Sequence, residues 1–200
     1  MLNVLGLEQS DKDAIRDSFE KLFQKYPCEY HNELTESFIN KIVDLQLLND
    51  YSTVSIKNIV KVNSNTSAFY MVSIYLANYA NRIKPRTLMY GLAFMKQDMK
   101  NILIRPETLW DKITDIFSRQ DIDFEEHKGF SNKYCLFAKD KEFVKQNLTQ
   151  QFLDEVYKMD KLYFEFSDKI ALSTYNKPIT TADTLKLAEF MGKIGIRGQE

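Results

Sequence analysis

The side chains best suited to binding zinc are two cysteines and two histidines, Cys28, His31, His127 and Cys135, which are the only residues of these types in the chain. Thiolate sulfur and imidazole nitrogen are the ligands of tetrahedral structural zinc sites. Only Cys28 and His31 have a ligand-like spacing, and we expect Cys28 to lie in a turn after Pro27. The sequence therefore favours two buried free thiols over a zinc site, and it carries no motif for a catalytic cysteine.

Acidic residues alternate along one short segment near the middle of the chain. Asp121, Asp123 and Glu125 would share one side of an extended loop, and His127 follows them. Such carboxylates could hold Mg²⁺ or Ca²⁺, but a calcium loop also needs a turn glycine and a bidentate glutamate at fixed spacing, and both are missing. We therefore expect a solvated loop and no cofactor or metal. A metal-dependent enzyme that uses these four residues is the third alternative for the function.

A third group of candidates combines basic and aromatic side chains between residues 51 and 100. Its members are Lys57, Lys61, Arg82, Lys84, Arg86, Tyr70, Tyr75, Tyr79 and Tyr90. This combination is typical of surfaces that bind nucleic acid or anionic lipid. The overall charge of −1 does not favour a polyanionic partner. We expect the tyrosines to belong to a sheet, with their hydroxyl groups at its rim.

The elements that position these residues begin with two predicted helices. Ser10 can cap a helix that starts at Asp11 and ends before Pro27. A second helix is predicted from about Asn32, because apolar residues follow at helical spacing. Those residues are Leu34, Phe38, Ile42, Leu45 and Leu48.

The pattern then changes to that of strands. Three runs rich in Val, Ile, Tyr, Phe and Met are expected over 52–62, 67–79 and 86–97. Short polar linkers at 63–66 and 81–85 favour an antiparallel meander. The middle run is apolar on both of its faces, so we expect both faces of the sheet to be covered.

The second half of the chain alternates strands and helices. Pro106 favours a helix start, and the buried stripe of that helix would be Trp110, Ile113 and Phe117. A strand is predicted over 130–138, followed by helices that Asp140 and Thr149 cap. A hairpin is expected around 167–169, and Thr180 or Thr181 starts a last helix.

These elements predict an α+β fold: a three-stranded antiparallel meander with flanking helices, followed by strand, helix, hairpin and helix. We expect a single domain over residues 1–200. An alternative is two sub-halves, 1–118 with the N-terminal helices and meander, and 119–200 with the remaining elements. The first 50 residues carry 10 acidic against 5 basic side chains, whereas residues 51–100 carry 1 against 7. The two segments could face each other, or each could be solvated separately.

Four segments of the sequence resemble a widespread bacterial family of uncharacterised proteins, many of which carry membrane helices ahead of a cytosolic-looking domain. The segments are Arg86-Thr87, Ile104-Arg105-Pro106-Glu107, Asp121-Ile122-Asp123-Phe124-Glu125-Glu126-His127 and Gly129-Phe130-Ser131-Asn132-Lys133-Tyr134. The family has no established activity, so the resemblance implies a fold and no catalytic residue. Here no apolar run precedes the matching region, and we expect membrane association only through a partner.

Composition and motifs exclude several classes of function. No apolar run approaches the roughly 18 residues of a membrane helix, and the two cysteines lack the spacing of a disulfide framework, so we expect a cytoplasmic protein. The six glycines are dispersed, and none forms a phosphate-binding loop.

The sequence thus predicts a non-catalytic domain for protein interaction or structure, whose partner is another protein or a second copy of the chain. The expected contact surface comprises Tyr70, Tyr75, Tyr79, Tyr90 and Met95, with Arg82, Lys84 and Arg86. The alternative is a domain that binds a small ligand between sheet and helices.

Overall fold

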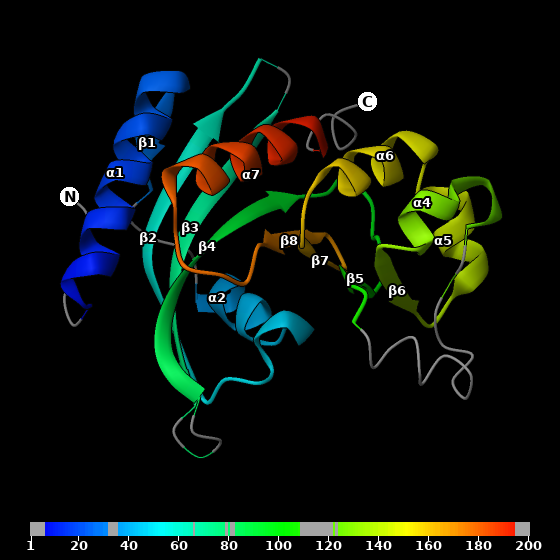
Figure 1. Cartoon of the computed structure of the whole chain (residues 1–200), viewed down its shortest axis with the longest axis horizontal. Coiled ribbons are helices and arrows are strands. Elements are labelled where there is room, and N and C mark those ends of the chain that lie inside the picture. Colours follow the sequence, from blue (N-terminus) through cyan, green and yellow to red (C-terminus); the bar gives the residue numbers. More distant parts are fainter. Residues whose placement is uncertain are drawn as a thin grey trace.

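A computed structural model describes residues 7–31, 36–65, 67–78, 80, 83–108, 122 and 124–194. The fold is α+β, as predicted, and its centre is one antiparallel sheet of eight strands in the order β1-β2-β3-β4-β8-β7-β5-β6 (Figure 1). The strands are β1 (Cys28–Tyr30), β2 (Thr53–Asn63), β3 (Ala68–Asn78), β4 (Ile83–Phe94), β5 (Ile102–Pro106), β6 (Tyr134–Ala138), β7 (Tyr163–Ser167) and β8 (Ile170–Thr174).

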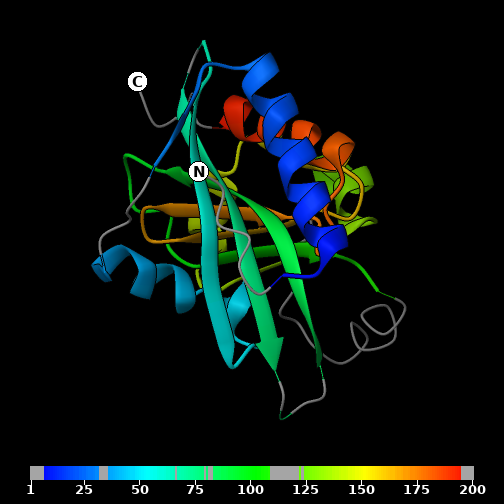
Figure 2. The same cartoon turned by 90° about the vertical axis from the view of Figure 1, so that its left-hand side faces the viewer.

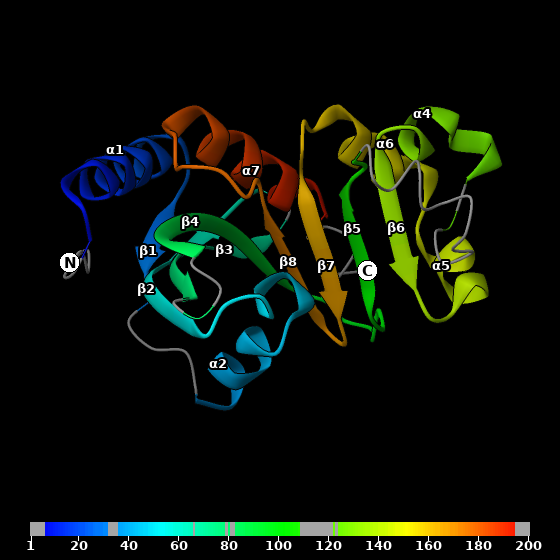
Figure 3. The same ribbon diagram turned by 60° about the horizontal axis from the view of Figure 1, so that its bottom comes forward.

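Helices lie on both faces of this sheet. They are α1 (Gln9–Lys25), α2 (Glu36–Val43), η1 (Gln46–Leu48), η2 (Glu125–His127), α4 (Lys128–Ser131), α5 (Lys141–Asn147), α6 (Gln150–Lys158) and α7 (Thr181–Ile194). Figure 3 shows α1, α7, α6 and α4 on one face and α2 on the other. None of the helices within the described ranges combines the length and the apolar character that crossing a lipid bilayer requires.

The predicted meander is confirmed as β2, β3 and β4, which pair antiparallel along most of their length. Figure 2 shows these three long strands side by side. The third strand begins at Ile83, earlier than predicted, because Ile83 pairs with Asn78 beyond a bulge. Pro85 therefore lies inside a strand, next to an irregularity in the pairing where the loss of its N–H is tolerated.

Each face of β3 packs into its own core, as its two apolar faces predicted. Phe69 and Met71 face α1 and α7, whereas Val72 and Ile74 face α2 and η1. All four side chains are at most 1% exposed. The first core extends under α5 and α6 to β5, β6 and β7.

Most helix boundaries follow the sequence signals. The side chains of Asp140, Thr149 and Thr180 each accept a hydrogen bond from the backbone N–H three residues later. The cap predicted at Ser10 is wrong, because α1 begins at Gln9, with Glu8 as an N-cap whose side chain makes no capping bond. The predicted helix after Pro106 and its stripe of Trp110, Ile113 and Phe117 lie outside the described residues.

Two parts of the sheet differ from the prediction. Cys28 lies in β1, which pairs with β2, and not in a turn. Residues 128–131 form a helical turn before β6, because His127 accepts a hydrogen bond from the N–H of Phe130 and so caps that turn. The strand predicted over 130–138 therefore starts only at Tyr134.

Candidate functional site

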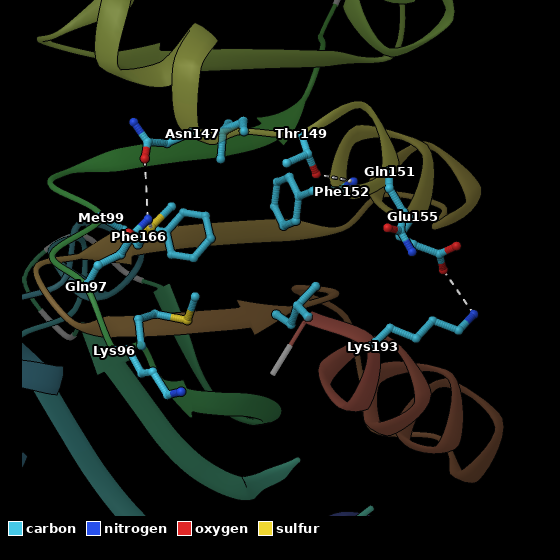
Figure 4. Close-up of a pocket in the computed structure, with 13 residues that line it drawn as sticks. Lys96, Gln97, Met99, Asn147, Thr149, Gln151, Phe152, Glu155, Phe166 and Lys193 are labelled. Atoms are coloured by element: carbon cyan, nitrogen blue, oxygen red, sulfur yellow. Dashed lines mark hydrogen bonds and ion pairs between the residues drawn. The ribbon is translucent and has the colours of Figure 1, made fainter. Parts of the chain in front are cut away.

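The site with the clearest capacity to bind another molecule is a groove between α6 and α7, over β7 (Figure 4). Its volume is about 230 Å³. We call it the apolar groove, and define it by Met95, Lys96, Gln97, Met99, Asn147, Leu148, Thr149, Gln151, Phe152, Glu155, Phe166, Lys193 and Ile194. The apolar members form its interior, and the polar and charged members form its rim.

Aromatic side chains give the apolar groove a rigid floor. Phe166 from β7 is 2% exposed, and its ring centroid lies 5.7 Å from that of Phe152 on α6. Beneath them Phe164 contacts both rings, at 4.5 Å from Phe166 and 5.3 Å from Phe152. Close-packed rings of this kind hold their shape when a ligand leaves. The floor is therefore formed before any ligand binds.

Three sets of contacts fix α6, which forms one wall. Thr149 caps its N-terminus. Asp154, on its second turn, lies 2.8 Å from Nε2 of His127. At the other end, the Lys133 ammonium donates to the carbonyls of Tyr157 and Met159, at 2.9 and 2.7 Å. A cation at a helix C-terminus satisfies carbonyls that have no partner within the helix.

The opposite wall is the last turn of α7. This helix lies close to the sheet at Gly91 of β4, where a Cβ would come within 2.4 Å of Met191 Cγ. At its C-terminal end, the Ser67 hydroxyl donates to the carbonyl of Gly192 at 3.0 Å. These contacts set the position of Lys193 and Ile194 on the rim.

The segment after β4 closes one end of the apolar groove. The N–H groups of Met95 and Met99 donate to the carbonyls of Lys169 and Asp168, at 2.8 and 2.7 Å, which ties the segment to the β7–β8 hairpin. The side chain of Gln97 reaches that of Asn147 at 3.3 Å. Two methionine side chains thereby line the end of the groove, and methionine adapts readily to differently shaped apolar partners.

An ion pair joins the two walls across the rim. Glu155 of α6 lies 2.9 Å from Lys193 of α7 and 2.6 Å from Lys158. The hydrogen bond from Lys158, followed by the influence of Lys193, lowers the pKa of the Glu155 carboxyl. The hydrogen bond to Glu155 in turn raises the pKa of Lys193. Both groups are charged at neutral pH.

The predicted contact surface is divided between the two faces of the sheet. Tyr75 packs toward the face of α1 and α7, whereas Tyr70 and Tyr90 pack toward the face of α2. Tyr90 is 1% exposed and, unlike Phe166, does not line the apolar groove. Among the predicted residues that the structure describes, only Met95 lines the apolar groove.

Two basic residues of that surface, Lys84 and Arg86, do not line the groove. Lys84 is exposed, and Arg86 is half-buried with its guanidinium bonded to the Tyr51 hydroxyl. Tyr79 and Arg82 lie outside the described residues. In β2, Lys61 forms an ion pair with Glu29 of β1 at 2.9 Å, and Lys57 lies over the ring of Tyr75.

The acidic segment is described only in part, because Asp121 and Asp123 lie outside the described residues and the Glu125 side chain is not described. His127 is 8% exposed. Its Nδ1 accepts from the N–H of Phe130, so its Nε2 carries the proton and donates to Asp154. With both ring nitrogens engaged, His127 has no lone pair left for a metal or for accepting a substrate proton.

The four Cys and His residues cannot form one metal site. Cys28 and Cys135 lie in β1 and β6, the two edge strands of the eight-stranded sheet. At a strand spacing of about 4.8 Å, they are roughly 30 Å apart. Both thiols are free, and burial raises the pKa of Cys28 to about 11.

One functional-looking residue that the sequence analysis did not identify is Glu165 in β7, which is 2% exposed. Its carboxylate accepts from the N–H groups of Gln46 and Leu47, at 2.9 and 2.8 Å. Burial raises the pKa of this carboxyl, while the two N–H groups oppose the rise. Glu165 thus anchors η1 to the sheet, and no local pattern in the sequence signals a contact between positions so far apart.

No protein-family model matches the sequence, and no curated protein matches it either. Among solved structures, the chain is similar to the crystal structure of the mycobacterial trehalose monomycolate transport factor A, TtfA, with a TM-score of 0.55. The alignment covers 90% of this chain and 91% of that chain, at 6% sequence identity. At this identity the likeness shows a shared fold alone.

Proposed function

We propose that this chain is a non-catalytic protein-interaction domain, and that the apolar groove receives apolar side chains of a partner protein. The observation that carries the proposal is the groove itself, in which Met95, Met99 and Ile194 surround a preformed floor of Phe152 and Phe166. Rigid, concave apolar sites with a polar rim are where interfaces concentrate their binding energy.

The volume of the groove favours side chains over a larger ligand. About 230 Å³ is below the range of ~300–1,000 Å³ that is typical of small-molecule sites. A small apolar ligand in the same groove is the second candidate function, and the apolar floor favours it. A partner protein would extend beyond the groove and contact its rim, whereas a small ligand would stay within the groove.

The engagement of both His127 nitrogens supports the non-catalytic part of the proposal. The two cysteines, which lie at opposite edges of the sheet and form no disulfide, fit a reducing compartment such as the cytoplasm. A cytosolic protein, or the cytosolic part of a membrane protein, is therefore the partner that we propose.

Photo-crosslinking from α6 tests the proposal. The photoreactive amino acid p-benzoylphenylalanine replaces Gln151, which lies on the rim, and in a matched variant it replaces the neighbouring Gln150, which is also exposed but lies off the rim. After irradiation in cells of the source organism, we expect position 151 to give a protein adduct that position 150 does not give.

Equal adducts from both positions, or none from position 151, would contradict the proposal. A crosslink to a small molecule instead of a protein, seen as a mass increase of the isolated chain, would favour the second candidate function. The identity of the crosslinked protein follows from mass spectrometry of the adduct.

A further inference from the structure

A second hollow adjoins the apolar groove along the same two helices. Its volume is about 380 Å³, and it lies between the C-terminal end of α6, Tyr175 after β8, and the outer side of α7. Glu155 and Lys193 line both hollows, so the two meet at this ion pair. A segment of a partner protein that fills one hollow can continue directly into the other.

We call this second site the charged hollow, because eight of its lining residues have acidic or basic side chains. They are Glu155, Asp160, Asp183, Glu189, Lys158, Lys177, Lys186 and Lys193. Four acidic and four basic groups balance each other. A balanced site does not attract a uniformly charged polyanion, but it can pair with side chains of both signs.

Most of these charges are already paired within the chain. Glu155 bonds Lys158 and Lys193, and Lys177 lies 3.1 Å from Asp183. Glu189 pairs with Lys193 at 3.2 Å, and among the residues that the structure describes, Lys186 on α7 and Asp160 after α6 form no ion pair. These two groups are available to a partner from opposite sides of the hollow.

We infer that the apolar groove and the charged hollow together bind one peptide segment, which has an apolar anchor flanked on one side by residues of both charge signs. The anchor occupies the floor of Phe152 and Phe166, and the charged residues pair with Lys186 and Asp160. The inference rests on the proposed function and specifies the partner. The Glu155–Lys193 pair lines both hollows, so it lies between the site of the apolar anchor and the site of the peptide's charged residues.

A displayed library of random 12-residue peptides, selected on the purified chain, tests this inference. We expect the selected peptides to share one apolar anchor with acidic and basic residues to one side of it. A synthetic peptide of that consensus is then titrated against variants by fluorescence anisotropy.

Three test variants and two controls separate the two parts of the site. Gln151→Trp fills the apolar groove, and we expect it to weaken binding about tenfold or more, whereas Gln150→Trp should leave binding within about twofold. Lys186→Glu and Asp160→Lys reverse the available charges, and each should weaken binding about five- to tenfold at low salt. Lys145→Glu makes the same charge change as Lys186→Glu, but it lies on α5, outside the residues that line the two hollows, and should have no such effect.

The outcomes distinguish the proposed function, binding in the apolar groove, from the inference that one peptide occupies both hollows. If Gln151→Trp weakens binding but both charge reversals leave it unchanged, the inference is overturned and the proposed function stands. If Gln151→Trp has no effect, or if no peptide is enriched, both are overturned. A consensus of one charge sign alone would also refute the inference, because a balanced hollow gives no preference for it.

Discussion

The position of α7 depends on a close contact at one glycine, which makes Gly91→Ala a sharp test of how the groove wall is held. A Cβ at this position would lie 2.4 Å from Met191 Cγ and 2.9 Å from its Sδ. Carbon atoms in contact are about 3.5–4.0 Å apart. Because Met191 is fully buried, either its side chain or α7 must move.

The magnitude follows from two opposing effects. Overpacking a core costs about 1–3 kcal/mol, whereas replacing glycine by alanine in a strand returns about 0.5–1 kcal/mol. We expect a net loss of about 1–2 kcal/mol in the free energy of unfolding. For a chain of 200 residues, this corresponds to a fall in Tm of about 2–8 °C.

The assay is thermal and urea unfolding followed by circular dichroism, on a double-mutant cycle with Met191→Ala. In the Met191→Ala background the clash is absent, so Gly91→Ala should be neutral or stabilising there. If Gly91→Ala costs the same in both backgrounds, the contact with Met191 is not the cause, and the account of α7 is refuted.

Three further predictions concern the anchors of the fold. Glu165→Gln removes a carboxyl whose pKa is raised above its ordinary value of 4.5 by burial. Because the unfolded chain loses this proton at lower pH than the folded chain, the wild type should lose stability relative to the variant as the pH rises from 4.5. A wild type that gains stability relative to the variant over this range would contradict the prediction. Thr149→Ala should cost about 1 kcal/mol in urea unfolding by removing the α6 cap, while Thr149→Ser should cost less, and equal losses would argue against capping. His127→Ala should cost about 2 kcal/mol because one buried and one partly buried hydrogen bond are lost, whereas His127→Asn, which keeps an acceptor for the Phe130 N–H, should recover part of it; no recovery would argue against the cap.

Local signals predicted the parts of the fold that depend on neighbouring residues. The long apolar runs of β2, β3 and β4 gave the meander, and Asp140 and Thr149 gave the starts of α5 and α6. The turn around Asp168 also follows from sequence, since Ser167-Asp168-Lys169 separates two alternating runs; in the structure Asp168 adopts a φ of 50°, which suits a tight hairpin.

The parts that were not predicted depend on distant pairing. β1 has three residues, too few for a strand pattern to be seen. β5 lies between β6 and β7, and nothing near β5 in the sequence specifies those neighbours. The apolar groove arises where this sheet order brings α6 beside α7, so Met95 is the one described member of the predicted contact surface that lies in it.

Methionine methyl NMR tests the central claim most directly, because the methionines report on separate parts of the molecule. Met95 and Met99 line the apolar groove, Met159 lines the charged hollow, and Met71 lies in the core beneath α1 and α7. On adding the selected peptide to the chain labelled with ¹³C in its methionine methyl groups, we predict shifts at Met95 and Met99, with Met159 following and Met71 unchanged. Binding that leaves Met95 and Met99 unchanged would show that the partner binds elsewhere and would contradict the proposed function.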